Sequence, residues 1–135
     1  MTRMIIPSTF LRRALLLDAV SCAALGLLMA VCAAPLGWWF HLPLPLLRES
    51  GLVLLAFAAV LGWACTRPQL PRLLVLGIVA GNALWAIDSV LLLLPAWIAP
   101  NGLGASFILV QAIATALIAE LEYVGLKRSA TAAMA

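Results

Sequence analysis

The sequence predicts an all-α fold in which four helices form an integral membrane bundle. Hydrophobic residues make up 66% of the 135 residues and charged residues only 10%, with a mean hydropathy of +1.17. In soluble proteins about a quarter of residues are charged. Four apolar stretches are also long enough to cross the hydrocarbon core, which needs about 20 residues. We therefore expect a single transmembrane domain over residues 1–135, with the lipid bilayer as its main surroundings.

The predicted spans are separated by proline and glycine, which interrupt helices. They cover residues 14–34, 45–66, 73–94 and 104–124. The first resembles a secretory signal, but Asp18 interrupts it and it exceeds the usual length of about 7–15 apolar residues, so we expect this helix to be retained. The second begins at Pro45, a favourable first helical residue. Its Arg48 and Glu49 side chains are long enough to reach the interface.

Matches between the two halves of the chain raise the hypothesis of a tandem repeat. Leu15 aligns with Leu74, and Val20 aligns with Val79. Each half is then a two-helix hairpin, and the halves are parallel repeats. Chance matches are the competing explanation in a chain this rich in leucine and alanine.

Basic residues predict the orientation of the bundle. Seven of the eight lie on one side of the predicted membrane: Arg3, Arg12, Arg13, Arg67, Arg72, Lys127 and Arg128. Cytoplasmic loops carry an excess of such residues. Both termini are therefore expected in the cytoplasm.

Asp88 is the most informative polar residue, because it stands inside the span 73–94. An ionisable group in the bilayer costs roughly 2.5–3.5 kcal/mol and is a functional-site hypothesis by default. Asn82 and Ser89 lie beside it on the helix, and Gln111 is expected at a similar depth on the next span. This predicted intramembrane polar cluster is either a proton or cation site or, our preferred interpretation, a neutral lock between helices.

Other charges are expected at the cytoplasmic interface. Asp18, Glu120 and Glu122 lie near the inner ends of their spans, close to Arg13 and Arg72. Interfacial salt bridges are the simplest explanation for them. Asp18 also shares a helical face with other small and polar residues, which leaves a role inside the bundle open.

Small residues predict where the helices pack. Association in lipid relies on close backbone approach and on hydrogen bonds between helices. We expect these contacts at Gly26, Gly62, Gly77 and Gly81. The same residues are equally suited to contacts with another chain.

The sequence lacks the residue patterns that several classes of function require. No nucleophile constellation, phosphate-binding glycine loop or metal-ligand spacing is present, so we expect neither catalysis, metal nor cofactor. His41 alone cannot supply a metal or haem site. The basic residues lie at helix ends and form no basic face with interleaved aromatics, which argues against a nucleic-acid partner.

Three segments resemble a group of uncharacterised bacterial four-helix inner-membrane proteins: 15–20 (LLLDAV), 82–89 (NALWAIDS) and 120–128 (ELEYVGLKR). This resemblance covers most of the chain. It implies four spans and a multi-pass place in the bacterial inner (cytoplasmic) membrane, and it implies no activity. The chain also resembles small multidrug exporters in having one carboxylate, Asp18, in its first span, although those exporters place theirs deep in the bilayer.

Two functions follow as hypotheses. The leading one is a structural or accessory membrane protein that forms a homo-oligomer or joins a larger membrane complex, because the loops are short and catalytic groups are few. The alternative is a small proton-coupled transporter with Asp88 as its coupling carboxylate.

Overall fold

The computed structural model describes residues 3–94 and 98–132. Within them, four helices are long and apolar enough to cross a membrane: α1 (Thr9–Val31), α3 (Leu44–Cys65), α4 (Arg72–Leu91) and α5 (Gly102–Lys127). Their bounds lie within a few residues of the predicted spans. The prediction of a helical, multi-pass membrane protein is therefore confirmed.

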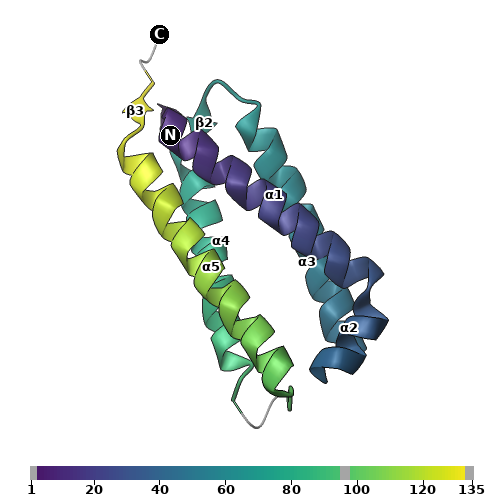
Figure 1. The fold of residues 1–135 in the computed structure, drawn as a ribbon. Helices are drawn as coiled ribbons and strands as arrows, with labels where there is room; N and C mark the ends of the chain where they lie inside the picture. Colours follow the sequence, from purple (N-terminus) through teal and green to yellow (C-terminus); the bar gives the residue numbers. More distant parts are fainter. Residues whose placement is uncertain (1–2, 95–97, 133–135) are drawn as a thin grey trace.

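The helices form two hairpins that lie side by side (Figure 1). α1 packs along α3, α4 packs along α5, and α1 and α5 join the two hairpins. Both described ends of the chain lie at one end of the molecule, which we name the terminal end. The opposite end carries the short helix α2 (Ala33–Phe40) and is named the α2 end.

Helix α2 begins at Ala33, inside the predicted first span, and continues into the stretch 35–44 that separates the first two predicted spans. Pro35 occupies its first turn, where the missing backbone N–H of proline costs no helical hydrogen bond. The helix ends at Phe40, and the next residue, His41, has a left-handed backbone with φ of 53°. The chain reverses there, and α3 begins at Leu44 with proline in its first turn.

A three-stranded antiparallel sheet closes the terminal end. β1 (Met4–Ile6) lies in the centre, between β2 (Leu70–Pro71) and β3 (Ala130–Thr131). It joins the N-terminal segment, the connection between the hairpins and the segment after α5. Strands of two or three residues show no alternation of apolar and polar side chains, and the sequence therefore did not predict them.

Glycine permits α1 and α3 to approach at backbone distance. A Cβ atom added at Gly26 would lie 2.9 Å from the carbonyl oxygen of Gly51, and one added at Gly51 would lie 2.7 Å from the nitrogen of Ala30. A second close approach joins the hairpins, because a Cβ atom at Gly125 would lie 2.8 Å from Cα of Leu11. These two contacts fix the position of α1 against both neighbours.

Other glycines predicted to mediate packing do not do so within the described chain. A Cβ atom at Gly62 or Gly77 meets nothing within 4 Å, and at Gly81 it makes ordinary contact with the ring of Phe57, at 3.7 Å. Gly26 alone among the four predicted positions lies at a backbone contact. Helical spacing locates small residues on a face, but the partner helix decides whether that face is covered.

Substituting Gly51 with alanine tests the packing of α1 on α3. The added methyl group forces the helices apart, and we expect the free energy of unfolding to fall by about 1–3 kcal/mol. Gly77→Ala is the matched control, because its methyl group meets open space and alanine favours a helix by about 0.5–1 kcal/mol. Unfolding of both variants in detergent, followed by circular dichroism, makes the comparison. Equal stabilities would contradict the close approach.

Candidate functional site

Three polar side chains from three helices meet inside the bundle. The side-chain nitrogen of Asn82, on α4, donates to Oδ2 of Asp18, on α1, over 2.7 Å. The same nitrogen donates to Oε2 of Glu122, on α5, over 3.0 Å. These side chains are 2%, 3% and 0% exposed for Asp18, Asn82 and Glu122. We name these three residues the carboxylate cluster.

Helical periodicity brings both carboxylates inside. Asp18 continues the buried stripe of α1 that includes Leu11, Leu15 and Cys22, at spacings of three, four and seven residues. Glu122 stands between Ala119 and Leu126 on the buried stripe of α5. Each carboxylate lies on an otherwise apolar helical face, so it is buried when that face packs against the neighbouring helices.

The carboxylate cluster contains more acceptors than donors. An amide nitrogen carries two hydrogens, and both are used, one for each carboxylate. The thiol of Cys22 donates to Oδ1 of Asp18 over 3.3 Å. Oε1 of Glu122 is buried and accepts nothing from the described residues. A neutral amide and a weak thiol donor thus face two carboxyl groups in a low-dielectric interior.

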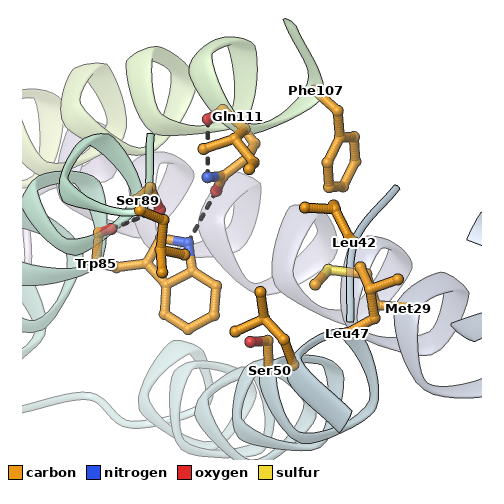
Figure 2. Close-up of a pocket in the computed structure, with 11 residues that line it drawn as sticks. Met29, Leu42, Leu47, Ser50, Trp85, Ser89, Phe107 and Gln111 are labelled. Atoms are coloured by element: carbon orange, nitrogen blue, oxygen red, sulfur yellow. Dashed lines mark hydrogen bonds between the residues drawn. The ribbon is translucent and has the colours of Figure 1, made fainter. Parts of the chain in front are cut away.

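A second set of polar contacts begins at Trp85, three residues after Asn82 on α4, and is drawn in Figure 2. The indole nitrogen of Trp85 donates to Oε1 of Gln111 over 2.8 Å, and the hydroxyl of Ser89 donates to the carbonyl of Trp85 over 2.7 Å. Gln111 also donates to the carbonyl of Ile108 over 2.9 Å. Trp85 is thereby held across the space between the hairpins.

Trp85 borders two cavities between the hairpins. The smaller, of about 40 Å³, is shown in Figure 2 and reaches Met29, Leu47 and Phe107. The larger, of about 180 Å³, has Asn82, Phe57 and Thr115 in its wall. We name the larger one the inner cavity. A water molecule takes up about 30 Å³ in the liquid. The inner cavity therefore has room for several waters beside the carboxylate cluster.

The structure corrects the placement of Asp88. This residue is exposed and borders an open hollow of about 400 Å³ that also includes Ser50 and Leu92. Helix α4 ends at Leu91 rather than at 94, so Asp88 lies in its last turn. The predicted placement of Asp88 on the bundle-facing side is therefore wrong, and Gln111 bonds to Trp85, three residues before Asp88 on α4. Of the predicted polar cluster, Asn82 and Ser89 are buried.

The expected interfacial charges separate into two groups. Glu120 and Arg13 are exposed and Arg72 is half-buried, as an interface permits. Asp18 and Glu122 are buried inside the bundle, where Asn82 bonds to them in place of the expected basic partners. Helix α1 begins at Thr9, where the side chain of Ser8 caps it by accepting from the nitrogen of Leu11. That earlier start places Asp18 nine residues inside the helix.

Sequence reasoning missed the carboxylate cluster, although a signal for it was present. Asp18 lies four residues from Cys22 and three from Leu15, and Glu122 lies seven from Thr115 and eleven from Gln111 on one face of its helix. Helical spacing of this kind marks a polar face turned inward. Taking Ser8 as the N-cap would have started the first helix earlier and placed Asp18 well inside it.

No protein-family profile, curated protein or solved structure matches this chain. Among residues 3–94 and 98–132, no group of three or more histidine, cysteine, aspartate and glutamate side chains is placed to hold a metal ion. The chemistry of the site therefore has to be derived from the carboxylate cluster and the cavities beside it.

Substituting Asn82 with leucine tests the carboxylate cluster. The change removes both amide hydrogens and leaves two buried carboxyl groups without their donor, which costs about 1–3 kcal/mol for an unsatisfied group. Thr115→Val is the matched control, because the Thr115 hydroxyl bonds only to the carbonyl of Gln111 in its own helix. Denaturant unfolding in detergent should show a much larger loss for Asn82→Leu. Similar losses would refute the bridging role of Asn82.

Proposed function

We propose that this protein is a small proton-coupled membrane transporter in which Asp18 and Glu122 carry the proton. The observation that supports it is the bridging of two buried carboxyl groups by one amide, with Oε1 of Glu122 left without a partner among the described residues. This proposal keeps the transport hypothesis and moves its coupling group from Asp88 to the carboxylate cluster.

The shortage of hydrogen-bond donors in the carboxylate cluster favours one bound proton there. Two negative charges held close together in a low-dielectric site repel strongly, and one proton shared between them removes a charge and supplies a donor. The other titratable neighbours are Cys22, which bonds to Asp18, and Cys65 near the end of α3. The Arg12 guanidinium donates to the carbonyls of Cys65 and Arg67 and does not reach either carboxylate.

The carboxylate cluster joins the two hairpins, which is where a transporter needs its coupling group. Asp18 belongs to the α1–α3 hairpin, whereas Asn82 and Glu122 belong to the α4–α5 hairpin. Alternating access is largely a rocking of one such unit against the other around a fixed site. A proton gained or lost there changes the attraction between the units.

Both ends of the seam between the hairpins are closed. The small sheet closes the terminal end. At the α2 end, the rings of Phe40 and Phe107 stack with centroids 4.8 Å apart, and Asn101 donates to the carbonyl of Trp39 over 2.6 Å. The inner cavity lies between these closures.

The terminal end is proposed to face the cytoplasm of a bacterium. Its elements carry seven of the eight basic residues, and Arg48 near the start of α3 is the eighth. The positive-inside rule supports this orientation. The resemblance to bacterial inner-membrane proteins supports the choice of membrane.

Infrared spectroscopy tests the bound proton directly. A protonated carboxyl group absorbs at a different infrared frequency from a carboxylate. We expect the wild-type protein in detergent to show the band of the protonated group at neutral pH. The double variant Asp18→Asn/Glu122→Gln should lack it, because no other buried carboxyl group is present in the described spans. Asp88→Asn is the control and should retain it.

Two outcomes contradict the proton site: no protonated band in the wild type at neutral pH, or an unchanged band in the double variant. If the double variant does not fold, the wild type labelled with ¹³C at the glutamate and aspartate carboxyl groups answers the same question. The band must then shift with the label.

The accessory function remains a second candidate, because small residues and an apolar groove lie on the outer surface of the α4–α5 hairpin. Gly77 meets nothing within 4 Å, and a shallow apolar groove of about 360 Å³ runs between α4 and α5 over Ala86, Ala112 and Ala116. Small residues of this kind let helices of another chain approach closely. A homo-oligomer or a larger membrane complex would use this groove.

Native mass measurement in mild detergent tests the accessory candidate. We expect a wild-type oligomer that Ala116→Leu converts to monomers, because the larger side chain fills the groove. Ala23→Leu, on an exposed face of α1, should leave the oligomer intact. A wild-type protein that is monomeric without any partner would exclude this candidate.

A further inference from the structure

The inner cavity combines aromatic walls with one polar corner. Its wall includes Val53, Leu54, Phe57, Asn82, Trp85 and Thr115. Phe57 comes from the α1–α3 hairpin, whereas Asn82, Trp85 and Thr115 come from the α4–α5 hairpin. A ligand in this space would contact both rocking units at once.

The polar corner presents oxygen rather than nitrogen. Both hydrogens of the Asn82 amide are directed to Asp18 and Glu122, so its nitrogen faces away from any ligand. Within the described residues, its carbonyl oxygen accepts no hydrogen bond. The hydroxyl hydrogen of Thr115 is donated to the carbonyl of Gln111. The oxygens of both side chains are therefore available as acceptors, and no free donor is offered for an anion.

The carboxylate cluster lies one side chain behind this wall. Asn82 and Cys22 border the inner cavity, and each also bonds to Asp18. A negative charge there attracts a cation in the cavity through a medium of low dielectric. Aromatic faces such as those of Phe57 and Trp85 attract weakly hydrated ammonium groups. An inorganic cation would lose its water without enough oxygen ligands to replace it.

We propose that the inner cavity binds a small organic ammonium ion with an apolar substituent, in exchange for the proton on Asp18 and Glu122. The proposal rests on the proton site described above and names its substrate class. When the cation enters, the shared proton leaves, so the total charge of the site is unchanged. When the proton returns, the electrostatic attraction is lost and the cation is released.

Benzyltrimethylammonium is a suitable probe. It combines one ring with a permanent charge, so any pH dependence of its binding arises in the protein. Neopentylbenzene has the same shape with carbon in place of nitrogen and is the neutral control. Binding of both to the protein in nanodiscs is measured by equilibrium dialysis at several pH values. We expect the charged probe to bind at least tenfold more tightly, and its affinity to fall as the pH is lowered.

Two variants of Phe57 test the location. Phe57→Leu keeps the bulk but removes the aromatic face, and we expect affinity for the charged probe to fall roughly threefold to thirtyfold. Phe57→Tyr keeps the ring and should retain affinity. Equal binding of the two probes, or unchanged affinity in a folded Phe57→Leu variant, overturns the proposal.

Exchange is measured in proteoliposomes. An acid interior should drive uptake of benzyltrimethylammonium as protons leave, and Asp18→Asn/Glu122→Gln should abolish it. The infrared band separates the possible failures. If the band is present and the charged probe has no advantage, only the cation site is wrong. If the band is absent in the wild type, the proton site itself is wrong, and so is the exchange built on it.

Discussion

The amide of Asn82 is the interaction on which the interior of this protein depends. Lipid offers no hydrogen bond to a carboxyl group, and an unpaired charge in the bilayer is costly. One amide nitrogen here serves two carboxyl groups from different helices. Replacing it with any apolar side chain leaves both without their donor. The three helices are thus held in one register by a group that cannot neutralise the charges it binds.

Close backbone packing makes this arrangement possible. Gly125 lies against Leu11 at backbone distance, and Glu122 stands less than one turn before Gly125 on α5. The closest approach of α1 and α5 therefore brings Glu122 toward the Asp18 side of α1. Gly26 and Gly51 lock α1 to α3 further along. The positions of the carboxyl groups follow from where the backbones can touch, and their chemistry follows from those positions.

Composition and hydropathy predicted the four spans well, because length and apolarity alone decide which segments lie in lipid. The predicted and observed helices differ mainly in where α1 begins and where α4 ends. Helix α1 starts five residues earlier than predicted, which places Asp18 nine residues inside the helix, and α4 ends three residues earlier, which places Asp88 in its last turn. Periodicity also identified inward faces on single helices. It could not pair Asp18 with Asn82 and Glu122, since partners on separate helices depend on contacts such as Gly125 against Leu11.

The seam between the hairpins is packed differently from the hairpins themselves. Within the α1–α3 hairpin, glycines bring backbones together, whereas along the middle of the seam Trp85 spans the space and cavities lie on both sides of it. The close contacts across the seam lie nearer its ends, at the sheet, at Gly125 and at the stacked rings of Phe40 and Phe107. Buried apolar side chains such as Leu61 and Ile78 also pack in the region between. Among the described residues, the hydrogen bond between Asn82 and Asp18 is the polar side-chain contact that joins the two hairpins in this region, so a proton gained or lost on Asp18 and Glu122 changes the charge at that contact.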